Sequence, residues 1–403
     1  MTTSLHSYRW YWAGALALAL VARAPVAAAQ VEARDAGARL ERVGDGVYVI
    51  IHDDATDDWP HGNTGVVVGD DGVLVVDATY LPSRARADIA LIRSVTAKPV
   101  RYLVYTHWHF DHNNGGIAYK QAFPGVTVVS ERENAGYIAL NGTWWAKMSV
   151  APGSPRQASL AVLETELSSG RDTAGAPLAA EARVRLTKAV RQRKSEMAEL
   201  ATLEVVPPNL LFDGALTLWL GKRRIDLVDR GRANSPHDVT VWLPDDRILF
   251  TGDIVVQSPL PYLLASWPVS WIQVLKDIEA VPAAALVPGH GPVLRDAGYV
   301  RQVRALLEAA TSRTAALALE GKTLDQIQAT LDLDDIRRAT PVWQDPALDA
   351  DWTESIRMLI ERAWRGVRGQ GYGRYSAGNP YSVPSIPPIT TVLPASTGGA
   401  AKP

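Results

Sequence analysis

Short apolar runs rich in β-branched residues recur through the first 130 residues and again between residues 216 and 288. Glycine and aspartate turns separate them, which is the pattern of strands, several of them buried on both faces. The predicted strands cover residues 47–51, 65–68, 73–76, 100–105, 126–129, 216–220, 225–228, 239–244, 248–251 and 285–288. Apolar residues at three- and four-residue spacing predict helices over 84–94, 116–123 and 131–140. Strands that alternate with helices indicate an α/β fold.

The pattern changes at Gly142-Thr143-Trp144-Trp145, which opens a region with proline and glycine breaks. Two helical stretches follow, over 154–169 and 179–203, and the second alternates arginine and lysine with leucine, valine and methionine. They predict a helical hairpin inserted at about 150–205 between the halves of the fold. Its simpler interpretation is a packing or dimer element. The alternative is a lid that shapes a pocket, with Trp144 and Trp145 as apolar walls.

The chain after residue 298 is predicted to be a helical extension over 299–368. Apolar residues at helical spacing cover 299–319 and 352–367, and residues 323–327 resemble a short capped helix. From residue 369 to 403 glycine, tyrosine, serine and proline dominate and no periodic apolar face survives. This tail is predicted to be disordered or draped over the surface.

Residues 1–29 have the pattern of a secretory signal peptide. Arg9 precedes an apolar run over 10–22, and Ala27-Ala28-Ala29 offers a cleavage site before Gln30. The run is short for a membrane span, so we expect cleavage and no stable membrane span afterwards; an uncleaved anchor is the alternative. The chain has no cysteine, which fits an exported protein without disulfides. We therefore expect secretion, to a bacterial periplasm.

Composition narrows the classes of partner. The formal net charge is −2, which provides no electrostatic footprint for nucleic acid or for an anionic membrane. With 403 residues and 47% hydrophobic residues the chain can bury a large core, and its length permits two domains. A small-molecule substrate remains the expected partner, and the oligomeric state is not indicated.

Four potential metal ligands lie within six residues after the strand predicted over 100–105: His107, His109, Asp111 and His112. His107 and His109 are two residues apart, so an extended segment can point both to one side. Asp111 and His112 are adjacent and can aim at a neighbouring point. Imidazole with carboxylate suits Zn²⁺, and also iron or manganese. A polar loop that binds nothing is the alternative, and three histidines with an aspartate in one hexapeptide argue against it.

The run His107-x-His109-x-Asp111-His112 resembles the signature of the metallo-β-lactamase superfamily. Further similar segments occur in family order, over about residues 41–295: His61-Gly62-Asn63-Thr64-Gly65 followed by residues 72–77, then Thr251-Gly252-Asp253, then Gly289-His290-Gly291. The resemblance implies a four-layer αβ/βα sandwich of two mixed sheets flanked by helices. It places this domain at residues 30–298, with the helical insertion inside it.

The resemblance also implies a ligand set. One site uses His107 and His109, and where the family has a further histidine this chain has Asn234, a weaker ligand for Zn²⁺. His237, three residues later, is the alternative to Asn234. The other site uses Asp111, His112 and His290, with Asp253 between the two. Asp77 is either an acceptor that orients a ligand or a turn residue at a strand end.

The implied activity is hydrolysis by a metal-activated water, with one or two Zn²⁺ per chain. Asp111 is the candidate catalytic residue, because it can steer water or take a proton. The bond is an ester, thioester, lactone or β-lactam of a small molecule, and the fold does not identify the substrate. Two alternatives remain: an iron-dependent oxidoreductase of the same fold and a non-catalytic member that binds metal or ligand. Three aromatic residues either line an apolar pocket or pack in the core: Tyr262, Trp267 and Trp271.

Overall fold

The computed structural model of the chain describes residues 37–52, 61–257, 260–261, 263 and 266–369. Its contacts divide the chain into two compact units. Unit 1 is Met1–Phe212 with Thr217–Ile225, and unit 2 is Asp213–Leu216 with Asp226–Pro403. The predicted signal peptide lies outside the described residues, as does the predicted tail apart from Gly369.

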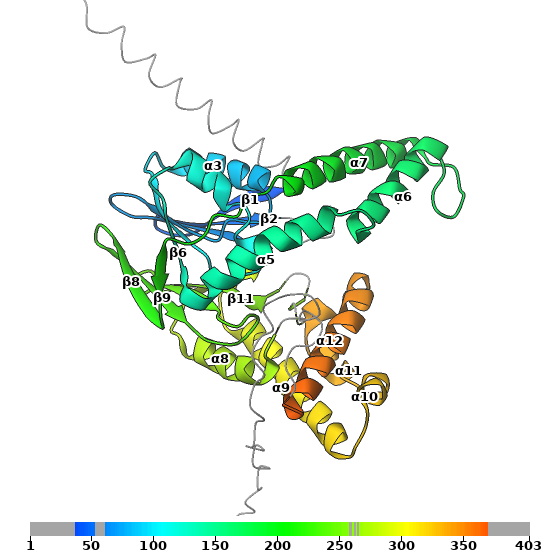
Figure 1. The fold of residues 1–403 in the computed structure, drawn as a ribbon. Coiled ribbons are helices and arrows are strands. Elements are labelled where there is room, and N and C mark those ends of the chain that lie inside the picture. The colour runs from blue at the N-terminus through cyan, green and yellow to red at the C-terminus, as the bar shows by residue number, and fades with distance from the viewer. Residues whose placement is uncertain (1–36, 53–60, 258–259, 262, 264–265, 370–403) are drawn as a thin grey trace, which may run out of the picture. The chain divides into compact units, whose positions relative to one another are not determined.

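A seven-stranded mixed sheet forms the centre of unit 1 (Figure 1). Its strands follow one another in sequence order, antiparallel from β1 to β4 and parallel from β4 to β7. They are β1 (Ala38–Gly44), β2 (Val47–His52), β3 (Thr64–Val68), β4 (Val73–Val76), β5 (Val100–Val104), β6 (Thr127–Glu131) and β7 (Leu210–Phe212). The hydrophobic pattern predicted five of these strands and missed β1 and β7. Half-exposed β1 and three-residue β7 lack a continuous apolar run.

Two helices connect the parallel strands of unit 1. α3 (Pro82–Val95) links β4 to β5, and α4 (Gly116–Ala122) lies between β5 and β6. Ile89 and Ile92 of α3 and Tyr119 of α4 join strand residues in one buried apolar cluster. A parallel pair needs such a crossover, and the apolar face of each helix covers the sheet.

The helical insertion consists of three long helices in unit 1: α5 (Arg132–Val150), α6 (Pro155–Ser169) and α7 (Ala180–Ala201). Figure 1 shows α6 and α7 side by side as a hairpin, at the predicted positions. The predicted break at Gly142 is wrong, because α5 continues through it. A Cβ at Gly142 would lie 2.8 Å from a methyl group of Val205. This glycine therefore permits close packing.

The base of the insertion packs beside the loop that carries the candidate ligands. Tyr80 and Leu81 share a buried cluster with Ala146 of α5 and Leu200 of α7, and Phe110 packs against it. The side chains of Trp144 and Trp145 lie outside the described part of the structure, so their predicted role as pocket walls stays a prediction.

The second sheet has five strands in the order β12-β11-β10-β9-β8. It belongs to unit 2 except for Thr217–Ile225, which covers most of β8, the following turn and the start of β9 and is assigned to unit 1. β11 and β12 are parallel, whereas β9, β10 and β11 are antiparallel neighbours. The bounds are β8 (Ala215–Leu220), β9 (Arg223–Asp229), β10 (Val239–Leu243), β11 (Ile248–Val256) and β12 (Ala285–His290). β11 runs five residues beyond the prediction because a register shift at Gly252 lets pairing resume.

Helices complete unit 2: α8 (Pro268–Ala280), α9 (Gly298–Leu319), α10 (Leu324–Thr330), α11 (Asp334–Arg338) and α12 (Asp349–Val367). Thr323 caps α10 with a capping box, in the region where a capped helix is predicted. α8 was not predicted. Trp271 of α8 is fully buried in the core and donates its Nε1–H to Ile254 O at 3.1 Å, which is the core-packing interpretation. Tyr262 lies outside the described residues. No helix in the described ranges is long and apolar enough to cross a membrane.

Candidate metal centre

The loop that follows β5 carries all four ligands of the sequence motif, and each of their side chains is buried. A short 3-10 helix, Phe110–His112, follows the first pair and carries the second pair, Asp111 and His112. Asn113 fixes this turn, because its side-chain amide donates to the carbonyls of Trp108 at 3.0 Å and His109 at 2.6 Å. These hydrogen bonds lie within the loop itself and fix its conformation, as is needed to hold ligands in place.

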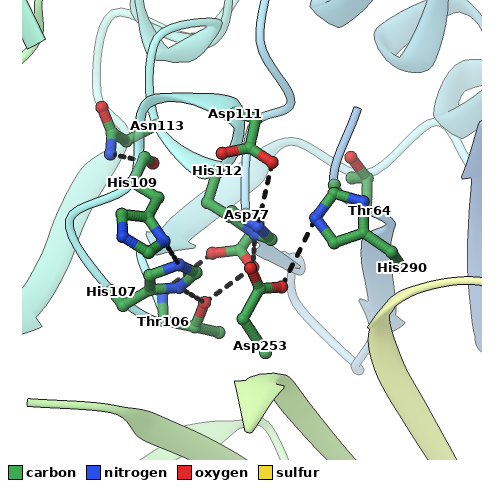
Figure 2. A network of polar contacts seen from close by, with 12 residues as sticks. Thr64, Asp77, Thr106, His107, His109, Asp111, His112, Asn113, Asp253 and His290 are labelled. Atoms are coloured by element: carbon green, nitrogen blue, oxygen red, sulfur yellow. Dashed lines mark hydrogen bonds and ion pairs between the residues drawn. The ribbon is translucent and has the colours of Figure 1, made fainter. Parts of the chain in front are cut away.

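His107 and His109 point ring nitrogens at each other. His107 Nε2 lies 2.8 Å from His109 Nδ1, and the contact is drawn in Figure 2. On its other side, His107 Nδ1 lies 3.1 Å from the hydroxyl of Thr106. That hydroxyl gives its own proton to Asp77, so it can only accept from His107. The proton of His107 therefore sits on Nδ1, and Nε2 keeps a lone pair for a cation.

Asp77, at the end of β4, accepts three hydrogen bonds (Figure 2). Its Oδ1 receives the amide of Thr106 at 2.8 Å, and its Oδ2 receives the Thr106 hydroxyl and Nδ1 of His112, both at 2.8 Å. A carboxylate only accepts, so His112 Nδ1 carries the proton and Nε2 is left as a ligand atom. Asp77 thus orients two imidazoles, one directly and one through Thr106. The structure supports the interpretation of Asp77 as an orienting acceptor.

Asp111 lies beside His112, with 3.5 Å between a carboxylate oxygen and His112 Nε2. Gly62, from the segment before β3, lies next to both residues, and its amide donates to the backbone oxygen of Asp111 at 3.3 Å. A Cβ on Gly62 would lie 2.6 Å from the ring of His112, so only glycine fits there without displacing the imidazole. Gly62 belongs to the segment His61-Gly62-Asn63-Thr64-Gly65, one of the segments that resemble the family. Its lack of a side chain leaves room for the ring of His112.

A buried pair of side chains holds the segment of Gly62. His52 contacts Gly62 O through Nδ1 at 2.9 Å and Asp88 Oδ1 through Nε2 at 3.0 Å, and Thr64 donates to the other Asp88 oxygen. The carbonyl of Gly62 accepts a hydrogen bond, so Nδ1 of His52 carries a proton. The contact with Asp88 also needs a proton, either on Nε2 of His52 or on the carboxyl group. Neither His52 nor Asp88 was identified from the sequence, because they are 36 residues apart.

The side chains of the ligand motif suit the binding of a cation. The three imidazoles and the carboxylate are buried. His107 and His112 each have Nδ1 hydrogen-bonded, and Nε2 of His107 faces the ring of His109. Hydrogen bonding of a ligand histidine through its second nitrogen is the usual arrangement in protein metal sites. His107 with His109, and Asp111 with His112, each belong to a group of residues that could hold a metal ion.

In unit 2, Asn234 lies in a tight turn between β9 and β10 and is fully buried. Asp238 holds this turn, because its Oδ2 accepts the amides of Ala233 at 3.2 Å and Ser235 at 2.8 Å. Burial raises the pKa of Asp238 to about 7, although these hydrogen bonds lower it in part. The amide of Trp267 also donates to Ala233 O. The contact from Trp267 comes from outside the turn's own sequence, so tertiary structure helps to place Asn234.

His237, the alternative to Asn234, has a different environment. Its Nδ1 lies 3.0 Å from a carboxylate oxygen of Asp229, and its side chain is 23% exposed. Asn234 has no exposed surface. Asn234 is buried, whereas His237 is partly exposed and contacts Asp229, which favours Asn234 as the residue directed inward.

Asp253 and His290 lie close together on the parallel strands β11 and β12 of unit 2, with 3.4 Å between His290 Nε2 and Asp253 Oδ1 (Figure 2). Gly252, at φ +51°, allows the register shift that turns Asp253 out of the regular ladder. A Cβ on Gly289 would lie 2.0 Å from Asp253 Oδ1. The glycine before the histidine therefore leaves room for the neighbouring carboxylate.

Replacing Asp77 with asparagine should weaken metal binding by about 10- to 100-fold. Asparagine also tolerates the left-handed backbone of this position, at φ +63°. Its amide NH2, however, would face either the one donor at Oδ1 or the two donors at Oδ2. Competition with a metal-binding dye measures the affinity. Asp45→Asn is the matched control, since the Asp45 side chain is 93% exposed. Equal affinities of the two variants would show that Asp77 does not orient the ligands.

The chain is similar to known proteins in sequence and in fold. A sequence model of the metallo-beta-lactamase superfamily matches residues 57–321. A linear primary-alkylsulfatase from a Pseudomonas species is 23% identical over 326 residues, which is 79% of this chain and 57% of that protein. The solved sec-alkylsulfatase Pisa1 from Pseudomonas sp. has a TM-score of 0.57 at 18% identity, over 85% of this chain and 52% of its own. A metallo-beta-lactamase from Pontibacter korlensis has a TM-score of 0.45 at 17% identity, over 67% and 99%.

This chain therefore spans little more than half the length of the alkylsulfatases that it resembles. The similarity to Pisa1 shows the fold, and the predicted fold class of two mixed sheets with flanking helices and a C-terminal helical extension is confirmed. Together the matches support a metal-dependent hydrolase in general. Since the matched region is more than half of the sequence and contains every motif quoted above, the chain belongs to the metallo-beta-lactamase superfamily.

Proposed function

We propose that the protein is a metal-dependent hydrolase that cleaves an ester bond of a small molecule. Membership of the superfamily supports hydrolysis, and the two relatives named as alkylsulfatases make a sulfate ester the first candidate. A carboxylic ester, a thioester, a lactone and a β-lactam are the other bonds to test. The observation that carries the proposal is the set of hydrogen bonds that His107 donates to Thr106 and that Thr106 and His112 donate to Asp77, which prepares both imidazoles as ligands.

The proposed ligand set follows the order of the family motifs. His107, His109 and Asn234 belong to one site, and Asp111, His112 and His290 to the other, with Asp253 between them. These ligands come from both units, and their joint use is part of the proposal. Zn²⁺ is the proposed metal, one or two ions per chain, and iron and manganese are the alternatives for these donors.

Metal ions in this family supply a bound water of lowered pKa and positive charge for the developing anion. The residues of the chain have separate tasks. The imidazoles of His107 and His112 are held in one tautomer by Thr106 and Asp77, so they need no rearrangement to bind. Asp111 is the least buried member of the motif, at 8% exposure, which supports the proposal that it orients water or accepts its proton.

Metal content of the purified protein tests the proposal directly. We expect zinc, with one equivalent lost to a chelator well before the other, because an amide oxygen binds Zn²⁺ less strongly than imidazole. Asn234→His should hold that equivalent more tightly. Iron in place of zinc would favour the oxidoreductase, and no metal at all would favour a non-catalytic binding protein. Two equivalents lost together would contradict the assignment of Asn234.

A substrate panel then identifies the bond. An alkyl sulfate, p-nitrophenyl acetate, a thioester, a lactone and a chromogenic β-lactam cover the classes above. Turnover of one class that stops when metal is removed and returns with zinc supports the proposal. Equal turnover before and after removal of the metal would overturn it.

We also propose that the protein is exported to a bacterial periplasm. The leader pattern over 1–29 supports this, and these residues lie outside the described part of the chain. N-terminal sequencing of the protein from a cell fractionation should begin at Gln30. An intact leader would contradict cleavage.

A further inference from the structure

Two buried arginines from the helical insertion share one carboxylate. Arg156 in the first turn of α6 and Arg193 of α7 both approach Glu196 of α7. Arg156 Nη1 lies 3.5 Å from Glu196 Oε2, and Arg193 Nε lies 3.7 Å from the same oxygen. The three side chains are between 4% and 8% exposed. Charged groups are rarely buried to this degree, so each of their donors requires an acceptor.

Arg156 uses only part of its hydrogen-bonding capacity within the described structure. Its Nε and Nη2 are buried and have no hydrogen-bond partner there, whereas Nη1 faces Glu196. Nε and Nη2 form the edge of a guanidinium whose two N–H bonds run parallel. That edge matches two oxygens of a carboxylate, sulfate or phosphate group. The donors that lack a partner are therefore the pair best arranged to hold an oxyanion.

The surroundings of Arg156 add to its positive potential. It is the second residue of α6, a helix of 15 residues whose N-terminus is capped by Ser154. The partial positive charge of the helix start favours an anion at this end. Glu196, the acidic neighbour of Arg156, is shared with Arg193. One oxygen of the Glu196 carboxylate therefore lies near both guanidinium groups.

This arginine lies close to the candidate metal loop. Its guanidinium carbon is 6.0 Å from the ring centroid of Tyr80, and that ring is 5.2 Å from the ring of Phe110. Phe110 is the residue before Asp111 in the ligand motif. Arg156 and the loop are thus separated by two aromatic rings of the same unit.

We propose that Arg156 binds an oxyanion through Nε and Nη2, with the first turn of α6 contributing to the field. The ligand is a sulfate, sulfonate, phosphate or carboxylate, either free or as part of a larger molecule. This assigns a binding role to the helical insertion, for which packing was the simpler expectation. The proposal stands independently of the hydrolytic activity, because it concerns binding by groups outside the ligand motif.

Binding of inorganic sulfate to the full chain, as purified with its metal, tests the proposal. Titration calorimetry and the melting temperature are measured in sodium sulfate and in sodium chloride of equal ionic strength. Sulfate should raise the melting temperature of the wild type, and Arg156→Gln should weaken its binding by about tenfold or more. Arg191→Gln, an exposed arginine of α7, is the matched control for loss of charge and should bind as the wild type does. No sulfate binding by the wild type, or equal binding by Arg156→Gln and Arg191→Gln, would overturn the proposal.

A second variant guards against a loss of binding that merely reflects misfolding. Glu196→Gln removes the carboxylate that competes for Arg156 and leaves its bidentate edge intact. It should lower stability without sulfate, bind sulfate more tightly than the wild type, and recover stability as sulfate is added. A purely structural ion pair predicts the loss of stability without any gain in sulfate affinity. That result would also overturn the proposal.

Once a hydrolysed substrate is known, the source of the oxyanion can be determined. If the anion is a group of the substrate, Arg156→Gln should raise KM for anionic esters while KM for neutral esters and kcat stay near their wild-type values. If the anion is free, sulfate should still bind while both KM values stay unchanged. Failure of hydrolysis alone would leave the sulfate titration intact, so the two proposals can fail separately.

Discussion

Replacing Asp111 with asparagine is expected to lower kcat of the proposed hydrolysis by about 10²- to 10⁴-fold, the range found for general acid–base groups. Asparagine keeps the shape of the side chain and the backbone acceptor that Gly62 uses, so the loop can fold as before. It loses the negative charge beside His112 and cannot take a proton. The rate should be expressed per bound metal ion, because Asp111 is also a proposed ligand.

The matched control is Asp245→Asn in the turn between β10 and β11, where the aspartate is exposed. This variant should retain wild-type kcat and metal content. If Asp111→Asn binds metal and turns over as fast as Asp245→Asn, Asp111 has no role in the chemistry. If it loses metal and rate in proportion, Asp111 acts only as a ligand.

Trp343→Ala should lower the free energy of unfolding by about 3–5 kcal/mol, the usual effect of removing a large buried aromatic side chain. Trp343 is fully buried in the core cluster of unit 2 and packs against Tyr299 and Trp352, with ring centroids 5.9 and 5.6 Å away. Its Nε1 donates to the hydroxyl of Tyr299, which in turn donates to Val256 O at the end of β11. The C-terminal helices are thus coupled to the strand that carries Asp253.

Chemical denaturation measures this loss, with Trp219→Ala as the control. Trp219 lies on β8 and is 55% exposed, so its removal should change stability by less than about 0.5 kcal/mol. Equal stabilities of the two variants would mean that the C-terminal helices add little to the core. Loss of metal binding in Trp343→Ala without loss of stability would contradict a purely packing role.

The strands and the long helices could be predicted because their apolar periodicity is local. Residues 73–76 coincide with β4, and residues 154–169 and 299–319 each differ from a helix by one residue. The errors arose where distant packing decides. By propensity Gly142 predicts a helix break, yet α5 continues through it. Val205 leaves little room there for a side chain, so close packing accounts for the glycine. Half-exposed β1 and the brief β7 join the sheet through their backbone.

The ligand motif was readable because its donors lie within six residues, whereas the groups that orient them are scattered. Asp77 could be suspected from its place at a strand end, but its bonds to Thr106 and His112 span about thirty residues. Asp238 and the pair His52–Asp88 carry no local signal, since an isolated aspartate or histidine is common in turns and strands. Arg156 looks like an ordinary charged residue of an amphipathic helix. Only burial distinguishes it.

Gly289 has a consequence for any attempt to redesign the protein. It has no side chain to bind anything, yet a single added carbon atom would overlap Asp253 and the backbone at Gly252. A library that varies His290 or Asp253 to change the metal therefore has to keep position 289 fixed. The choice of residues at positions 253 and 290 is therefore restricted by the absence of a side chain at position 289 as well as by the metal.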